Sequence, residues 1–435
     1  MFEETISNKI RYILSHVDRD RYSKTYGCCD RLYWGWKLKD FPDATLQRYA
    51  YPLAKYFSMK DGLTNDKIDI ILSILKYTGT IIHKDGSCDQ AYPGEHSHAA
   101  TAFLLFDVAN AYLIIEKKIE NADKSSILEL LKRMGSYLLK NDEKHGIISN
   151  HILGAGAALE LLSHIFNKHE YHDKALEYVY RIIKMQNKEG WFNEYGGADP
   201  GYQTLGIYYL ANFYQYCKDE KVLLSLKNAV DFVSYFIQPD GSFGGEYGSR
   251  STEIFYMGGF ALMRNAIPVC NDILNFMLKS SAENKTVTLY DIDQWNLAPL
   301  LNNYLLVSNY QVGEEYDLPL NKNFLKEFKE SGLIVYSSQN TYMVICVSKG
   351  GMIKVFDKML QELVLNDCGY IGSYQGKTIT SQVTSVNSYD LKNNTLVIDC
   401  PLYSISQPIP SPYIFVAIRV YSLLFGSYSA VREFL

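Results

Sequence analysis

Residues 187–203, NKEGWFNEYGGADPGYQ, decide the fold of this chain. The stretch holds four glycines, four aromatic side chains and the acids Glu194 and Asp199. Runs with helical spacing precede and follow it, ALEYVYRIIKMQ at 175–186 and TLGIYYLANFYQY at 204–216. Because glycine permits tight backbone turns, the stretch is typical of a loop between two helices. Its aromatic side chains either cap the core or line a cleft, since sites are usually built on loops of a rigid scaffold.

Related stretches recur along the chain, each between helical runs. They are KDGSCDQAYPGEHS at 84–97, EKHGIISNHILGAG at 143–156 and QPDGSFGGEYGSRSTE at 238–253. Their shared glycines and that of the first stretch, spaced 44 to 60 residues apart, are Gly86, Gly146, Gly190 and Gly241. A repeat of this length that holds two helices indicates stacked helical hairpins, which form an open solenoid or a closed toroid. The polar and aromatic loops favour one closed α/α toroid over residues 1–310, with all four glycines at one end.

A second pattern begins near residue 331. Residues 333–407 alternate apolar and polar side chains and are rich in Val, Ile and Thr, which predicts antiparallel strands packed on the toroid. Gly350–Gly351 and Asn393–Asn394 are typical of hairpin turns. We therefore expect a mainly α protein with a C-terminal β domain: an α/α toroid over 1–325, then a short antiparallel β-sandwich over 326–435 with no obvious closing strand.

Composition narrows the class of protein. The 435 residues carry a net charge of −5 and no long basic run, which argues against a nucleic-acid binder. The 36 tyrosines offer flat faces with polar tips, which suit carbohydrate stacking. Eight scattered cysteines form no CxxC pair, so we expect no metal cluster, and nothing indicates a cofactor. We see no secretory signal and no run of 18 apolar residues, so we expect a cytoplasmic protein without a membrane span. The oligomeric state stays open.

Four short motifs carry a resemblance. They are DRLYWGWKLKDFPDA at 30–44, SNH at 149–151, GADPGYQ at 197–203 and GEYGSRSTE at 245–253. With the toroid and β domain, they resemble the heparinase II/III-like polysaccharide lyases, and the first also resembles heparinase-like proteins found beside surface-polysaccharide genes. The resemblance implies cleavage of uronic-acid polymers by β-elimination. It also implies that the pair Asn150–His151 neutralises the uronate carboxylate, with His151 as a possible base, and that Tyr202 is the catalytic tyrosine.

The chemistry of this reaction can be argued separately. The C5 proton of a uronate becomes removable when an amide or a protonated imidazole stabilises the developing enolate. One group must take that proton and an acid must protonate the leaving O4. Arg250 offers the natural fork for a carboxylate. We therefore predict a catalytic set of Asn150, His151, Tyr202 and Arg250.

Each member of this set also has an ordinary structural explanation. Asn150 suits a helix N-cap, and Tyr202 could be one more buried tyrosine, with Tyr195 next in line. Arg250 could form a surface ion pair with Glu246 or Glu253.

A wider set of side chains is predicted to contact substrate. Trp34 and Trp36 either stack on sugar rings or anchor the core. His96 and His98 have metal-like spacing without a third ligand nearby, so one is expected to contact substrate and the other to lie in the core. The full set is Arg31, Trp34, Trp36, His96, His98, Glu194, Tyr195, Tyr247 and Glu253.

One departure keeps other functions open. Heparinase-like enzymes commonly use a later histidine, but the last histidine here is His172, so that role is empty or belongs to Arg250, Tyr247 or Tyr256. A toroid glycoside hydrolase would instead need paired carboxylates. Glu194, Asp199, Glu246 and Glu253 could supply them. A uronate epimerase, or an inactive glycan-binding protein of a surface-polysaccharide pathway, are the remaining alternatives.

Overall fold

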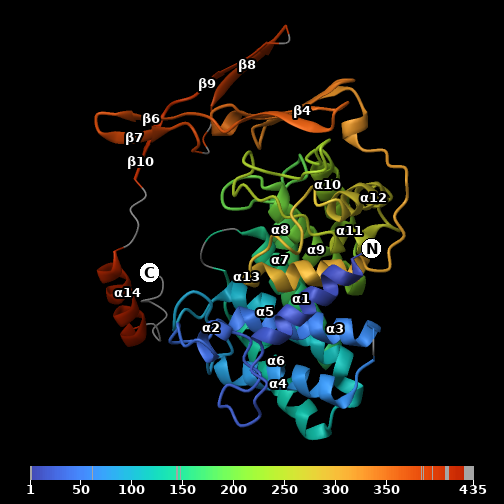
Figure 1. Cartoon of the computed structure of the whole chain (residues 1–435), viewed down its shortest axis with the longest axis vertical. Coiled ribbons are helices and arrows are strands. Elements are labelled where there is room, and N and C mark those ends of the chain that lie inside the picture. Colours follow the sequence, from blue (N-terminus) through green and yellow to red (C-terminus); the bar gives the residue numbers. More distant parts are fainter. Residues whose placement is uncertain are drawn as a thin grey trace.

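The computed structural model describes residues 2–60, 62–143, 146, 148–383, 385, 387–393, 395–406 and 411–425. Figure 1 shows a helical body with antiparallel strands across one of its ends. The predicted fold class, a helical toroid followed by antiparallel sheets, is therefore confirmed.

Paired helices build a closed ring. In the described residues, the outer helices are α1 (Glu3–His16), α4 (Asn65–Ile81), α6 (Asn121–Lys140), α8 (His169–Met185), α10 (Glu220–Ser234) and α12 (Val269–Ala282). Each is followed by an inner partner: η1 (Ala44–Tyr49) with α3 (Ala50–Lys60), α5 (His98–Ile115), α7 (Ser149–Phe166), α9 (Pro200–Cys217), α11 (Gly258–Met263) and α13 (Gln294–Val307). Neighbouring inner helices contact one another around the ring, and α13 packs against α3 and η1, which closes the toroid. The short helix α2 (Arg31–Trp34) lies between α1 and η1, and η2 (Glu116–Lys118) lies between α5 and α6.

Burial distinguishes the two rings. The outer helix α8 buries one stripe, Tyr171, Ala175, Tyr178, Val179 and Ile182, as an amphipathic surface helix does. The inner helix α5 is buried on most of its circumference. With η2 it spans His98–Lys118 and is long and apolar enough to cross a membrane, but 72% of its most apolar window is buried inside the protein. This is the behaviour of a core helix.

Glycines fix the loops that lead into the inner helices. Gly86 and Gly190 have φ of 95° and 101°, and a Cβ on either would lie 2.0 or 2.2 Å from a carbonyl oxygen of the next outer helix. Gly27, which the repeat search does not find, has φ of 90° and would place its Cβ 2.1 Å from the Ser73 oxygen. Gly241, with φ of 92°, would instead place its Cβ against side chains, 2.8 Å from the Lys285 Cβ. Every such loop leads from an outer to an inner helix, so these glycines share one end of the toroid, as predicted.

Two glutamines of inner helices hold the loops at Gly190 and Gly27 by hydrogen bonds. The Gln203 amide donates to the Gly190 oxygen at 3.1 Å and accepts from the Phe192 N–H at 2.8 Å. Gln47 does the same around Gly27, donating to its oxygen at 3.0 Å and accepting from the Cys29 N–H at 2.7 Å. The recurring loop is therefore a repeated hydrogen-bonded unit as well as a sequence repeat.

The strands follow α13 and the short helix η3 (Pro319–Asn321). A five-stranded antiparallel sheet has the order β1 (Phe324–Phe328), β2 (Leu333–Ser337), β3 (Thr341–Cys346), β4 (Met352–Asp357) and β5 (Glu362–Asp367), with η4 (Val347–Lys349) before β4. A second sheet has the order β10 (Tyr403–Ile405), β7 (Lys377–Thr380), β6 (Ile371–Tyr374), and β8 (Ser388–Lys392) pairs with β9 (Thr395–Asp399). Burial alternates along β3 and β4, as the two-residue period predicts.

Two details differ from the sequence prediction. Pro412–Phe425, inside the expected β domain, forms the helix α14 because its apolar residues do not alternate. Gly350 and Gly351 end η4, so β3 and β4 are not joined by a two-residue turn. The predicted hairpin at Asn393–Asn394 is confirmed, since β8 and β9 pair antiparallel on either side of it, with Asn393 at φ of 50° and Asn394 outside the described residues.

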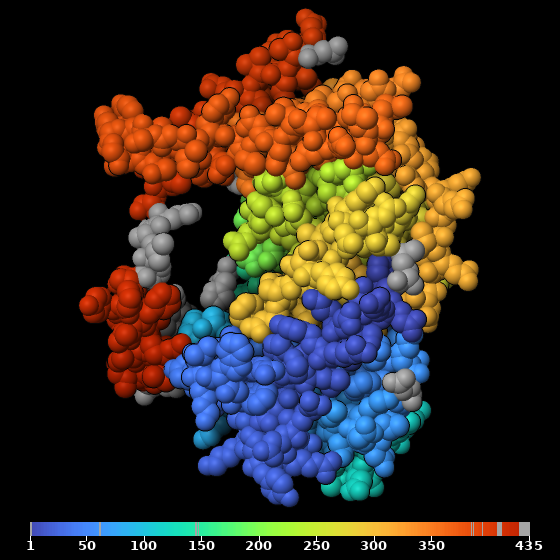
Figure 2. Space-filling view, in the orientation of Figure 1, coloured from blue at the N-terminus to red at the C-terminus, as the bar shows by residue number. Residues whose placement is uncertain are grey.

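In Figure 2 the five-stranded sheet, in orange, lies against the green-to-yellow part of the toroid. Phe328 packs its ring against Phe232 and Phe236, at 5.1 and 5.8 Å between ring centres. The Glu189 carboxylate accepts hydrogen bonds from the N–H groups of Glu330 and Ser331, at 2.8 and 3.2 Å. The turn between β1 and β2 thus fixes the loop 186–199 through Glu189.

The next toroid loop, 235–257, is held by the same sheet. Lys349 donates to the carbonyl oxygens of Glu246 and Gly248, at 3.0 and 2.5 Å. Lys354 pairs with the carboxylates of Glu246 and Glu253, at 2.7 and 3.5 Å. Both loops that the sheet contacts also carry predicted site residues.

Candidate active site

Helix starts bring three predicted catalytic residues together. His151 lies on the first turn of α7 and Tyr202 on the first turn of α9. Asp199 is the N-cap of α9: one carboxylate oxygen accepts from the Tyr202 N–H at 3.0 Å, and the other accepts from the Arg250 N–H at 2.9 Å. This single buried carboxylate fixes Tyr202 and Arg250 beside each other.

The ring of Tyr195 is the centre of the cluster. Its centre lies 6.3 Å from that of the His151 imidazole, at a right angle, and 5.5 Å from that of the Tyr202 ring. The guanidinium carbon of Arg250 lies 4.5 Å from the centre of the same ring. His151, Tyr202 and Arg250 therefore surround one partly exposed tyrosine, although they come from three separate loops.

His151 is oriented by a buried acid that sequence reasoning missed. Its Nδ1 lies 3.0 Å from a carboxylate oxygen of Glu143, whose side chain is almost fully buried. When Nδ1 donates to this carboxylate, the lone pair on Nε2 is free to accept a proton. Glu143 stands at the start of a predicted loop, but nothing in its spacing separates it from an ordinary surface acid.

The two tyrosines are held in their protonated forms. Burial raises the pKa of Tyr202 above its ordinary value, and the charge of Arg250 opposes this rise. Burial likewise raises the pKa of Tyr195 to about 12. Near neutral pH both phenols therefore carry a proton that they can donate.

Asn150 lies behind this cluster, in contact with Glu194. Glu194 has no exposed surface, and its two carboxylate oxygens accept from the Asn150 backbone N–H and side-chain Nδ2, both at 2.8 Å. Burial raises the pKa of Glu194 to about 8, while the two hydrogen bonds from Asn150 oppose the rise. The prediction that Glu194 contacts substrate directly is therefore wrong in this structure, because Asn150 stands between.

A buried polar network closes the centre of the ring. Arg48 of η1 donates to Asp107 of α5 at 2.6 Å and to the Tyr209 hydroxyl of α9 at 3.2 Å. Asn302 of α13 donates to the other oxygen of Asp107 at 3.1 Å. The Phe103 ring stacks on Tyr209 at 5.1 Å and meets His151 edge-on at 5.5 Å, so it joins this network to the cluster. The sequence could have indicated this buried network, because Asp107 is the one charged residue in the apolar run 98–115.

A cavity of about 280 Å³ opens beside Tyr202. Its lining includes two further predicted site residues, Arg250 and Glu253, and Tyr256 from the loop before α11 (Gly258–Met263). The remaining lining residues are Ser251, Thr252, Ile254 and Asn296. Of the three residues proposed to replace a late histidine, Arg250 and Tyr256 line this cavity and Tyr247 does not.

Several predicted contacts lie elsewhere. His98 is buried, 3.2 Å from the Tyr178 hydroxyl, and burial lowers its pKa to about 4, so it is the core histidine of the pair. His96 bonds to Asp85 at 2.8 Å and stacks on His83 at 3.9 Å, which holds its own loop. Tyr247 is buried and accepts from the Gln238 amide at 2.9 Å. His98 and Tyr247 are therefore corrected to structural residues.

The aromatic segment near the N-terminus joins the first loop to α1. Arg31 donates to the Ser15 oxygen at 2.7 Å, and the Trp34 indole donates to the His16 oxygen at 2.8 Å. Both bonds satisfy carbonyls at the end of a helix, so these side chains have a structural task. Trp36 is 63% exposed.

The acids proposed for a hydrolase do not form a pair across a cleft. Glu194 and Asp199 are buried under the cluster, while Glu246 and Glu253 share Lys354 at the sheet. Within the described residues, no group of three or more His, Cys, Asp or Glu side chains is arranged to hold a metal ion.

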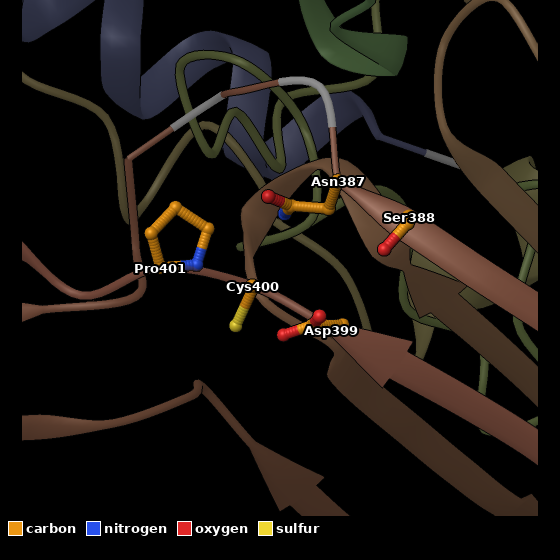
Figure 3. A pocket seen from close by; sticks show the side chains of 5 residues that line it. All are labelled: Asn387, Ser388, Asp399, Cys400 and Pro401. Atoms are coloured by element: carbon orange, nitrogen blue, oxygen red, sulfur yellow. The ribbon is translucent and has the colours of Figure 1, made fainter.

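A larger, shallow pocket of about 570 Å³ lies at the base of the β8–β9 hairpin. Figure 3 shows its lining, Asn387, Ser388, Asp399, Cys400 and Pro401. This lining holds neither a cation nor a phenol or imidazole, so the toroid cluster is the better candidate site.

One family model matches the helical part of the chain. Residues 50–261 match the sequence model of the ulvan lyase N-terminal domain, a span that includes α7, α9 and the three loops of the cluster. No curated protein matches the chain significantly.

Among solved structures, a Paenibacillus xanthan lyase matches with a TM-score of 0.57 and 9% identity over 87% of this chain and 43% of its own. Heparinase III matches with a TM-score of 0.57 and 12% identity over 84% of this chain and 58% of its own. Chondroitin AC lyase of Streptomyces coelicolor A3 matches with a TM-score of 0.54 and 9% identity over 81% and 57%. The chain thus spans about half the length of these structures. Its helical toroid has the fold of these polysaccharide lyases, and residues 50–261 are similar to an ulvan lyase N-terminal domain.

Proposed function

We propose that this protein cleaves an acidic, uronic-acid-containing polysaccharide by β-elimination. The observation that carries the proposal is the convergence of His151, Tyr202 and Arg250 around Tyr195, on the loop end of the toroid. These side chains supply a proton acceptor, a proton donor and a cation for a carboxylate, which are the three groups that the reaction needs.

The roles follow from the state of each side chain. Arg250 pairs with the uronate carboxylate, which stabilises the charge that develops when the C5 proton leaves. His151 Nε2 takes that proton, and the Glu143 carboxylate stabilises the resulting imidazolium. Tyr202 donates its hydroxyl proton to O4 as the C4–O4 bond breaks and the C4=C5 double bond forms. Water then returns a proton to Tyr202, and the base loses one to solvent.

The exposed tyrosine and tryptophan suit a sugar chain. Tyr195 is 38% exposed and Trp36 more so, at the end of the toroid where the loops open. Aromatic faces stack on the apolar faces of sugar rings without demanding one sequence of linkages.

The test is incubation with a panel of acidic polymers. Proteins similar to this chain are named for ulvan, xanthan, heparin and chondroitin, so the panel begins with those polymers and adds other uronate polymers. We expect new ultraviolet absorbance from an unsaturated uronate together with new reducing ends. Reducing ends without this absorbance would show a hydrolase, and binding without either would show a glycan-binding protein.

A further inference from the structure

The cavity beside Tyr202 lies on the opposite side of that residue from His151. The inner helices follow one another around the ring in the order α7, α9, α11 and α13. His151 is on α7 and Tyr202 is on α9. Tyr256 and Asn296 line the cavity from the loop before α11 and from the first turn of α13. The site therefore continues past Tyr202 into a separate space.

The proposed reaction places the two sugars of the scissile bond on either side of Tyr202. His151 takes the C5 proton, so the uronate ring lies toward α7, with its carboxylate on Arg250. Tyr202 protonates O4, so the sugar that leaves with O4 lies beyond it, toward α11. The cavity volume of about 280 Å³ is just below the range of sites for drug-sized ligands, which suits one sugar ring.

Negative charge prevails on the wall that Glu253 forms. The Glu253 side chain is 48% exposed, and its carboxylate lies 3.5 Å from Lys354 Nζ. Lys354 is closer to Glu246, at 2.7 Å, so one positive charge serves two carboxylates. Among the described residues that line the cavity, Arg250 is the one cation, and in the proposed reaction the uronate occupies it. An anionic group on the leaving sugar would therefore meet an unbalanced negative charge.

Hydrogen bonding favours the same kind of sugar. Asn296 donates from Nδ2 to Asp293, the N-cap of α13, at 2.9 Å, so its Oδ1 points away from that acid and can accept a hydrogen bond. The Glu253 carboxylate also only accepts. Sugar hydroxyls donate to such oxygens, whereas carboxylates and sulfate esters have no proton to donate and would leave them unpaired.

We propose that this cavity binds the sugar that leaves with O4, and that Glu253 restricts that sugar to a neutral one, without a carboxylate or sulfate group. The preferred substrate is then a polymer that joins each attacked uronate to a neutral sugar. A polymer of uronate alone, or one sulfated next to the scissile bond, fits less well. The inference rests on the proposed function, because His151 and Tyr202 set the direction of the substrate.

Three polymers at equal ionic strength test the proposal on the full chain. In the first, uronate alternates with a neutral sugar. The second is the same polymer with sulfate on the neutral sugar, and the third is uronate alone. We expect kcat/KM on the first polymer to exceed that on each of the others at least about fivefold, the effect of one like charge about 4 Å away in water.

The substitution Glu253→Gln assigns this preference to one charge. The ratio of kcat/KM on the unsulfated polymer to that on the sulfated polymer should fall about fivefold, while Lys354 keeps its pair with Glu246. Glu362→Gln is the matched control, because it removes the same charge from the exposed strand β5, outside the cavity lining. It should keep the wild-type ratio. An unchanged ratio in Glu253→Gln would mean that shape excludes the sulfate, and would overturn the proposal.

Failure of this proposal can be told apart from failure of the proposed function. Cleavage of either charged polymer in preference to the unsulfated one leaves the function standing and overturns only the assignment of the cavity. If none of the three is cleaved, the proposed function fails, and calorimetry measures binding of the same polymers. Tighter binding of the unsulfated polymer, with the difference reduced in Glu253→Gln, supports the assignment. Equal binding, tighter binding of a charged polymer, or no binding of any polymer overturns it.

Discussion

The guanidinium of Arg250 lies over the face of the Tyr195 ring, 4.5 Å from its centre. Tyr195 reaches this position with φ of 55°, a left-handed backbone that a bulky residue adopts rarely. Gly196 follows directly and has φ of 86°, so the turn is sharp and carries the ring away from the core. Strained residues of this kind persist where the surrounding structure holds them, and such places are often sites.

Replacing Tyr195 should affect binding more than chemistry. Tyr195→Ala removes the ring that covers Arg250, a contact worth about 0.5–1 kcal/mol at an exposed position. We expect KM to rise while kcat stays close to the wild-type value, measured by steady-state kinetics on the best polymer. Tyr195→Phe keeps the ring and should change neither constant much. A collapse of kcat in Tyr195→Phe would show that Tyr195, and not Tyr202, is the proton donor.

Replacing Tyr202 should affect chemistry more than binding. Tyr202→Phe keeps the stacking face and removes the hydroxyl proton, so kcat should fall by about 10²–10⁴. Polymer binding, measured by calorimetry, should survive. Tyr247→Phe is the matched control, because its hydroxyl is buried against Gln238 on a neighbouring loop. Full turnover by Tyr202→Phe would remove it from the mechanism.

The contact between Glu143 and His151 should matter for turnover. Glu143→Gln keeps the size of the side chain but removes the charge that stabilises a protonated His151 and can favour the wrong tautomer. We expect a lower kcat with little change in KM and in the unfolding temperature. His151→Ala sets the scale, and Glu143→Gln should lose less than that variant. Equal activity of Glu143→Gln and wild type would show that the contact is only structural.

Two loop glycines offer a paired test of the repeat. Gly190→Ala and Gly196→Ala both place a side chain on a left-handed backbone, which costs about 1–2 kcal/mol. At Gly190 the new Cβ would also lie 2.2 Å from the Asn228 oxygen, whereas Gly196 has nothing within 4 Å. Thermal unfolding should therefore show a much larger loss for Gly190→Ala. Equal losses would mean that the close approach to α10 is not a constraint.

The toroid could be predicted because its loops repeat a glycine with a left-handed backbone, and at Gly86 and Gly190 a close backbone approach also excludes any side chain. The first loop escaped notice because Gly27 sits beside Cys28–Cys29 without the kernel of the other loops. The last loop, between α12 and α13, uses Asn284 with φ of 55° instead of a glycine. A left-handed position in a loop could thus be predicted from the sequence only where a glycine occupies it.

The residues that form the site were easier to predict than the burial of each one. His151 and Tyr202 follow from helix starts, and Arg250 from a loop at the same end of the ring. Burial does not follow in the same way: Glu194 and Tyr195 are neighbours in sequence, yet one is fully buried and the other is partly exposed. The turn at Tyr195 decides this, and a turn with a left-handed tyrosine has no sequence signature. Glu143 was missed because its partner is set by packing across the loop.

The contacts between the sheet and the toroid loops limit how the sequence of such a protein can evolve. Glu189 ties the loop of Tyr195 to the first sheet, and Lys349 ties the loop of Arg250 to it. Exchange of the sheet between relatives would therefore shift the spacing between these two side chains, even if every toroid residue stayed the same. The sheet and the toroid must therefore change together during evolution. In a chimera that joins the toroid of one relative to the sheet of another, Tyr195 and Arg250 would start at the wrong spacing.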